Sequence, residues 1–155
     1  MSTVITINVR PLVKKVILKS EATKEPISVQ LNTFLGRLIH ASVGKDTKKS
    51  KPADYDDYSE TLTLELPTSI TDYSYNRVKL SLVNETYYHK FKSDMFLFIT
   101  AQRSAGLSIQ NSIDNFLRYY NVKEEEYTPE TVRREWNRYC QKQQKNLKSS
   151  PAFLS

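Results

Sequence analysis

The sequence predicts an α+β fold, in which a small, mostly antiparallel sheet packs on helices and a C-terminal three-helix unit with helix-turn-helix-like character follows. In the first half of the chain, short segments alternate apolar and polar residues with the period of half-buried strands. After residue 84, apolar residues recur with the period of amphipathic helices. Ser108 and Thr128 are N-cap residues that indicate two separate helix starts. A chain of 155 residues is long enough for one domain, or for a small domain with a helical appendage.

These patterns divide the chain into two segments and a tail. Residues 1–83 are predicted to form a mixed α/β segment with an exposed loop at 45–59, because that loop is polar, charged and interrupted by a proline. Residues 84–148 are predicted to form a helical unit that packs with the first segment as one body. Residues 149–155 are predicted to be a frayed tail, since they are mostly polar and contain a proline.

The first predicted elements are a strand and a helix. Residues 4–9 alternate apolar and polar side chains, which favours a strand. Pro11 suits the first position of a helix, so we predict a short helix over 11–18, although its β-branched residues also permit a strand. A second short strand is predicted at 27–31 from the same alternation.

A second helix is predicted directly after this strand. Asn32 or Thr33 can cap its N-terminus, and Gly44 suits the left-handed conformation that often ends a helix. The apolar residues that share one face of this predicted helix are Leu35, Leu38, Ile39 and Val43.

The middle of the chain predicts two further strands and a long helix. Residues 62–66 and 78–82 each alternate leucine or valine with polar residues, so both are predicted as half-buried strands. They could pair antiparallel, although the connection of residues 67–75 is long for a hairpin turn. Asn84 is then predicted to cap a long helix that ends near Gln102. Its predicted apolar stripe consists of Tyr88, Phe91, Met95, Phe98 and Ile99.

Two capped helices follow between residues 108 and 148. Ser108 caps the first, whose apolar residues fall within one helical stripe. Thr128 caps the second, Pro129 occupies a position where a missing N–H costs nothing, and Glu130 lies in the positive first turn. The stripe of the first helix consists of Ile109, Ile113, Phe116, Leu117 and Tyr120.

The second of these helices has two different faces. One face is predicted to pack, and it consists of Val132, Trp136, Tyr139, Cys140 and Gln143. The roughly opposite face is basic and consists of Arg134, Arg138, Lys142 and Lys145. We call these four residues the basic stripe.

The paired helices indicate a nucleic-acid interface. Helix-turn-helix modules present a recognition helix to DNA in this manner. The connection of residues 121–127 is longer than their usual turn, lacks glycine and contains three glutamates, which must point away from phosphate. The basic stripe would contact phosphates, while Asn137 or Gln141 would lie near base edges. The alternative is that the basic stripe is only the solvated face of an amphipathic helix.

Charge is distributed unevenly along the chain. The formal net charge is +6, which favours an acidic partner. Residues 1–53 have ten basic and three acidic residues, whereas the block 54–75 has six acidic residues and no basic one. This acidic block could bind Mg²⁺ through Asp54, Asp56, Asp57 and Glu60, lie over the protein's own basic surface, or be merely solvated. We favour the solvated loop.

Other chemistry finds little support in the sequence. Three glycines, Gly36, Gly44 and Gly106, are too few and too scattered for a phosphate-binding loop. His40 and His89 lack the neighbours that a zinc site needs, and Cys140 is the single cysteine, which leaves no internal disulfide. We therefore predict no enzymatic activity, no cofactor and no metal. Without a membrane span or a signal peptide in the sequence, a cytoplasmic location is expected.

The segment IDNFLRYYNVKEEEYTPETVRREWNRY resembles the C-terminal part of small accessory proteins of temperate phages and conjugative elements of gut bacteria. The segments VRPLVKKVILK and EPISVQLNTFLGRLI are similar to the N-terminal part of the same proteins. The resemblance implies a mobile-element accessory protein, for which DNA is the expected partner, and it implies no catalytic residues. The alternative is a protein-interaction or virion-associated module, in which exposed tyrosines, Phe96 and Leu97 form a partner surface or a homodimer interface.

Overall fold

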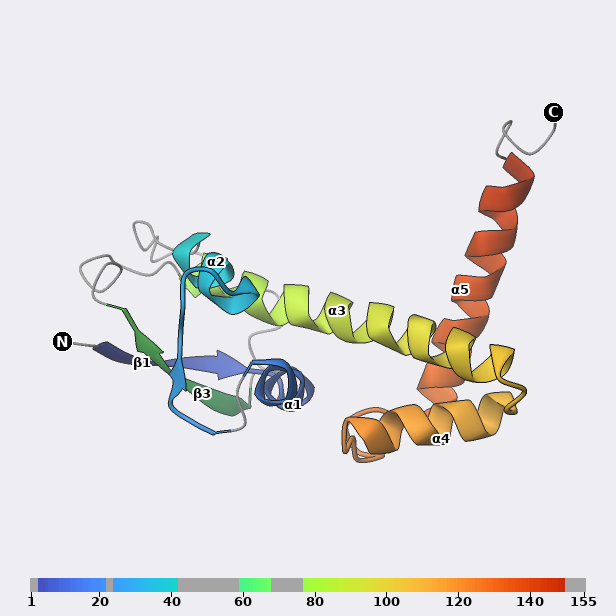
Figure 1. The fold of residues 1–155 in the computed structure, drawn as a ribbon, viewed down its shortest axis with the longest axis horizontal. Coiled ribbons are helices and arrows are strands. Elements are labelled where there is room, and N and C mark those ends of the chain that lie inside the picture. Colours follow the sequence, from blue (N-terminus) through green and yellow to red (C-terminus); the bar gives the residue numbers. More distant parts are fainter. Residues whose placement is uncertain (1–2, 22–23, 42–58, 68–76, 150–155) are drawn as a thin grey trace. The chain divides into compact units, whose positions relative to one another are not determined.

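A computed structural model of the chain describes residues 3–21, 24–41, 59–67 and 77–149. It confirms the α+β class, with a small mixed sheet and helices (Figure 1). The chain forms two compact units, Met1–Phe91 and Lys92–Ser155, and the division falls inside a long helix. In chain order the elements are β1 (Thr3–Val9), α1 (Pro11–Ser20), β2 (Ile27–Ser28), α2 (Phe34–Ala41), β3 (Glu60–Leu66), α3 (Arg77–Ser104), α4 (Ile109–Tyr119) and α5 (Pro129–Ser149).

The sheet of the first unit has the strand order β1-β3-β2. Strands β1 and β3 pair antiparallel from Thr3 opposite Leu66 to Val9 opposite Glu60, while β2 pairs parallel to β3. The predicted alternation is confirmed, because one face of β1 and β3 is buried and the other is largely exposed. The buried strand residues are Ile7, Val9, Leu62, Leu64 and Leu66.

The two short helices of the first unit follow their predicted signals. Pro11 begins α1, whose buried residues are apolar and recur with helical spacing. Thr33 caps α2, since its Oγ1 accepts a hydrogen bond from the backbone N–H of Gly36 at 3.1 Å. Gly36 is required there because a Cβ would collide with the carbonyl oxygen of Gln30. Strand β2 is shorter than predicted, and Leu31 beyond it is exposed.

The prediction of a strand at 78–82 is wrong, because α3 begins at Arg77 and includes this segment. Strand β3 already has β1 on one edge and β2 on the other, so no edge of β3 is left for another strand. A short alternation of apolar residues is weak evidence beside the stripe of helical spacing that continues it. The buried stripe consists of Val83, Tyr87, Phe91, Met95 and Ile99, whereas Tyr88 and Phe98 of the predicted stripe are only half-buried.

Asn84 is therefore not a helix cap but a buried residue inside α3. Its Oδ1 accepts a hydrogen bond from the backbone N–H of Arg10 at 2.9 Å. Its Nδ2 donates to the carbonyl oxygen of Asn8 at 3.1 Å. One amide side chain thus joins α3 to the corner between β1 and α1.

Tyr87 provides a second polar connection in the first unit. Its hydroxyl donates a hydrogen bond to the carboxylate of Glu21 at 2.8 Å, just beyond the end of α1. Its ring packs edge-on against Phe34 of α2, with 5.5 Å between ring centroids. Burial, reinforced by Glu21, raises the pKa of the Tyr87 hydroxyl far above its ordinary value.

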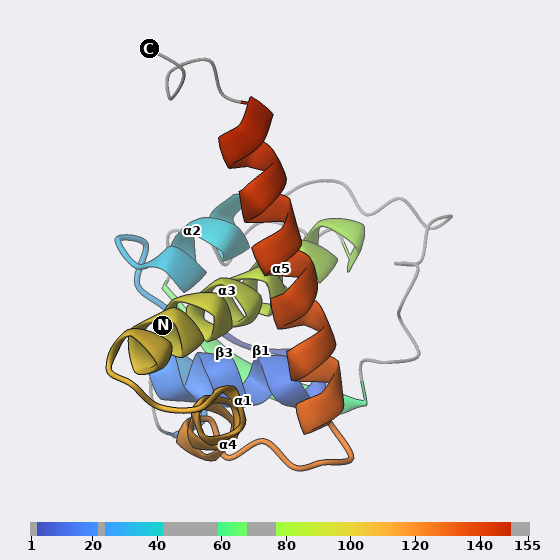
Figure 2. The same ribbon diagram turned by 90° about the vertical axis from the view of Figure 1, so that its right-hand side faces the viewer.

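The second unit contains the C-terminal part of α3 with α4 and α5. Gly106, at a positive φ of 90°, lies in the connection from α3 to α4, and Ser108 caps α4 by accepting from the N–H of Asn111 at 3.1 Å. Helix α4 runs back along the last turns of α3, and α5 crosses them steeply (Figures 1 and 2). Helix-turn-helix character is not confirmed by this arrangement. Among the described residues, no helix is both long and apolar enough to cross a membrane.

Candidate nucleic-acid interface

Helix α5 begins where the sequence predicts. The Oγ1 atom of Thr128 accepts a hydrogen bond from the backbone N–H of Thr131 at 3.1 Å, and Pro129 is the first residue of the helix. Val132, one turn later, is fully buried. The start of α5 is therefore fixed both by a cap and by packing. The position of Val132 then determines which residues of the following turns face α3 and α4 and which face solvent.

An aromatic cluster of Phe96, Trp136 and Tyr139 joins α5 to α3. The rings of Phe96 and Tyr139 stack nearly parallel, with 4.3 Å between centroids and 9° between planes. Trp136 lies 5.6 Å from Tyr139 and 6.5 Å from Phe96 by ring centroids. All three residues are half-buried, so the predicted packing face contacts α3 but part of its aromatic surface reaches solvent.

Helix α4 is joined to both of its neighbours by side-chain hydrogen bonds. Tyr120, which follows its last turn, donates its hydroxyl to Asp94 of α3 at 3.0 Å. Burial, reinforced by Asp94, raises the pKa of this hydroxyl far above its ordinary value. Arg133 of α5 donates to the side-chain oxygen of Gln110 at 2.8 Å. The first bond joins α4 to α3, and the bond from Arg133 holds one side of α5 against α4.

The four residues of the basic stripe are all exposed, as predicted. Within the part of the chain that the structure describes, none of them forms an ion pair. Asn137 and Gln141, the predicted base-reading residues, are exposed as well. The side of α5 turned away from the packing face therefore presents positive charge and amide groups to solvent.

Five of the six predicted contact residues line two shallow hollows on the surface of α5. The first, which we call the amide hollow, measures about 390 Å³ and is lined by Glu130, Arg133, Arg134, Asn137, Arg138 and Gln141. The second, which we call the aromatic hollow, measures about 320 Å³ and is lined by Lys92, Phe96, Glu135, Arg138, Tyr139 and Lys142. Arg138 lines both hollows, and Lys145 lines neither.

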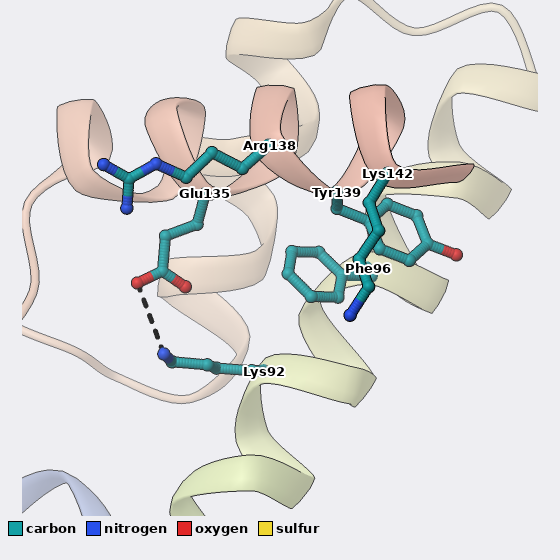
Figure 3. A pocket seen from close by; sticks show the side chains of 6 residues that line it. All are labelled: Lys92, Phe96, Glu135, Arg138, Tyr139 and Lys142. Atoms are coloured by element: carbon teal, nitrogen blue, oxygen red, sulfur yellow. Dashed lines mark ion pairs between the residues drawn. The ribbon is translucent and has the colours of Figure 1, made fainter. Parts of the chain in front are cut away.

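Sequence reasoning missed part of the aromatic hollow. Lys92 of α3 and Glu135 of α5 form an ion pair with 3.5 Å between Nζ and Oε1 (Figure 3). These residues are far apart in the chain, and only the packing of α5 on α3 brings them together. Phe96, which the sequence places in an alternative partner surface, and Tyr139, which it places in the packing face, both line this hollow.

The glutamates between α4 and α5 are placed in part. The carboxylate of Glu126 accepts a hydrogen bond from the backbone N–H of Lys123 at 3.0 Å, so this side chain turns back into its own connection. Glu124 and Glu125 are exposed. The connection thus partly meets the requirement that these carboxylates leave the basic stripe accessible.

The predicted acidic site falls mostly outside the described residues, which do not include Asp54, Asp56 and Asp57. Glu60 lies in β3, and its carboxylate is 3.9 Å from Nζ of Lys14. Among the described residues, no three histidine, cysteine or acidic side chains gather as a metal site would require. His40 and His89 are exposed on different helices.

No protein-family model matches this chain, and neither a curated protein nor a solved structure matches it.

Proposed function

We propose that this protein is a nonenzymatic DNA-binding accessory protein of a phage or other mobile element, and that it contacts phosphates through α5. The observation that carries the proposal is the basic stripe, whose residues are all exposed and form no ion pair with any described residue. Exposed positive side chains that pair with none of the described residues are available to neutralise phosphates and to release their counterions.

The spacing of the basic stripe fits an extended polyanion. From Arg134 to Lys145 the helix rises about 16 Å, at 1.5 Å per residue. Because one strand of duplex DNA has a phosphate about every 3.4 Å along its axis, the basic stripe can follow several successive phosphates. Helix α5 has six basic residues and two acidic ones, and one of the latter, Glu135, is paired with Lys92.

The amide hollow adds groups that can contact bases. Asn137 and Gln141 lie between cations that would hold the backbone, and an amide can bond adenine through its donor and acceptor together. A helix-turn-helix-like presentation of α5, with α4 behind it, is part of this proposal. The resemblance to accessory proteins of phages and conjugative elements supports the biological context.

The experiment is a titration of fluorescently labelled DNA at several salt concentrations, with anisotropy as the readout. Affinity should fall steeply with salt, and the double variant Arg134→Ala/Arg138→Ala should lower the slope of log K against log salt by about two. The matched control is Arg118→Ala/Lys123→Ala, which removes the same charge from exposed positions of the second unit outside α5. Equal effects of the two double variants would contradict the assignment to α5.

One observation favours the alternative of a protein-interaction or virion-associated module. Leu97 of α3 is 68% exposed, which is unusual for a large apolar side chain. A chain that binds no DNA even at low salt, but self-associates until Leu97 is replaced by serine, would establish this second candidate. Sedimentation velocity distinguishes the two outcomes.

A further inference from the structure

The aromatic hollow combines three kinds of chemistry on one side of α5. Its lining includes two stacked rings, one carboxylate, and lysine and arginine side chains. In Figure 3, Lys142 extends from α5 in the direction of α3, whereas the guanidinium group of Arg138 points away from the rings. Nothing in the phosphate contacts of the basic stripe accounts for the rings or for the carboxylate.

We propose that this hollow binds an unpaired base of single-stranded DNA, next to the phosphates that the basic stripe contacts. This inference rests on the proposed function and adds a preference for single strands over duplex. Proteins that bind single strands combine a positively charged track with aromatic rings on which bases stack, and the aromatic hollow places both within one site.

The rings provide the first argument. Phe96 and Tyr139 are half-buried, so their packing against each other still leaves aromatic surface in the hollow. In a duplex, neighbouring base pairs cover the faces of each base, whereas an unpaired base can stack on protein side chains. Stacking on an aromatic residue changes affinity by about fivefold to 150-fold per base in proteins of this type.

Glu135 provides the second argument, because a carboxylate is otherwise unfavourable beside a polyanion. The ion pair with Lys92 partly compensates its charge, since Nζ lies 3.5 Å from Oε1. A carboxylate has about four acceptor positions, so this one ammonium group leaves capacity for another donor. Cytosine offers such a donor in its exocyclic amine, whereas thymine has a carbonyl oxygen at that position. Glu135 therefore favours cytosine over thymine.

Arg138 provides the third argument, because it lines both hollows and belongs to the basic stripe. A strand whose phosphates follow the basic stripe passes directly beside the aromatic hollow. Lys142 lies one helical turn further along α5 and lines the same hollow. One base can thus enter the hollow while its own phosphate and the next phosphate of the strand stay near cations.

The test uses the full chain and three labelled probes of equal length: oligodeoxycytidylate, oligothymidylate and a mixed-sequence duplex. The wild-type chain should bind oligodeoxycytidylate most tightly and the duplex least tightly. Tyr139→Leu should weaken single-strand binding at least fivefold and change duplex affinity less than twofold. Tyr119→Leu is the matched control, since Tyr119 is an exposed tyrosine of the second unit outside the hollow.

Glu135→Gln keeps the shape of the side chain and tests the base preference without depending on the rings. It should reduce the ratio of cytosine to thymine affinity by about fivefold, because it replaces a charged acceptor with a neutral one. An unchanged ratio would overturn the role of Glu135 even if Tyr139→Leu disturbed the fold. Equal losses for single strands and duplex in Tyr139→Leu would overturn the stacking site.

The outcomes separate this inference from the proposed function. If the duplex binds as tightly as single strands and Arg134→Ala/Arg138→Ala weakens both, the DNA-binding function stands and the hollow is not a base site. If none of the three probes binds at low salt, the proposed function fails as well. Tighter binding of single-stranded RNA than of DNA with the same sequence would overturn the assignment to DNA.

Discussion

The two units of the chain differ in how some of their basic side chains are engaged. In the first unit, Lys14 lies 3.2 Å from the carboxylate of Glu25 and donates to the carbonyl oxygen of Thr61 at 2.7 Å. In the second unit, aromatic packing holds α5 against α3, while the basic stripe on α5 stays exposed. Cations paired within a protein contribute to its structure, whereas exposed unpaired cations contribute to its external potential. This contrast, rather than net charge, is the reason why we propose α5 as the interface.

The largest predicted effect concerns the aromatic packing of the second unit. Phe116→Ala should cost about 3 to 5 kcal/mol of stability, because the ring is fully buried and packs against Phe98 and Tyr120. Thermal unfolding measures the loss, and hydrogen exchange should show faster exchange at residues 92–149. The same substitution at Tyr119, which is 55% exposed, should cost far less. Similar costs at both positions would mean that α4 is not anchored as described.

The next effect tests the polar packing of the first unit. Asn84→Ala should cost about 2 to 4 kcal/mol, because it leaves the N–H of Arg10 and the carbonyl of Asn8 without their shared partner. Chemical denaturation gives the free energy of unfolding. Asn115→Ala is the control, since this half-buried residue donates one hydrogen bond to Gln102. A loss below 1 kcal/mol for Asn84→Ala would contradict its role in joining α3 to β1 and α1.

A pair of lysine substitutions compares the two units directly. Lys14→Met should reduce stability by about 1 to 2 kcal/mol and leave DNA affinity unchanged, because Lys14 is engaged inside the first unit. Lys142→Met should leave stability unchanged within about 0.5 kcal/mol and weaken DNA binding. Denaturation and anisotropy on both variants provide the readout. A reversed pattern would remove the distinction between structural and exposed cations.

The smallest effect is a pH dependence that belongs to the first unit. The backbone N–H of Thr63 donates to the Glu25 carboxylate at 2.8 Å and, together with Lys14, holds the pKa of Glu25 below its ordinary value of 4.5. A lowered pKa in the folded state stabilises the protein above 4.5, and this contribution disappears as pH falls through the folded value. Glu25→Gln should therefore show a smaller loss of stability below pH 4.5. Identical acid unfolding curves would contradict this role for Glu25.

Local signals in the sequence were sufficient for much of the fold. Thr33, Ser108 and Thr128 each cap the helix that they predict, because a cap depends on residues within one turn. The alternation in β1 and β3 predicted their buried faces correctly, since both strands lie with one face on the core. These features need no information from distant parts of the chain.

Features that depend on distant contacts could not be predicted. Whether residues 78–82 form a strand or a helix depends on the edges of β3, which β1 and β2 already occupy. The sequence around Asn84 predicts a cap, because the hydrogen-bonding partners of Asn84 at Asn8 and Arg10 are far away in sequence. The exposed face of α5 follows from residue spacing within one helix and was predictable. The pairing of Lys92 with Glu135 depends on the packing of α5 on α3 and was not predictable.

The end of α5 differs from its start in one further respect. Residues 143–149 are all exposed, and this segment stands away from α3 and α4 in both ribbon views (Figures 1 and 2). Its helicity therefore depends on its own backbone hydrogen bonds and on the good helix propensity of lysine and glutamine. Lys145 keeps its place in the basic stripe only while these last turns are helical, so the apparent affinity for the proposed polyanion would scale with the helical fraction. If α5 is the interface that we propose, warming would weaken binding by fraying these last turns, without a change in any contact residue.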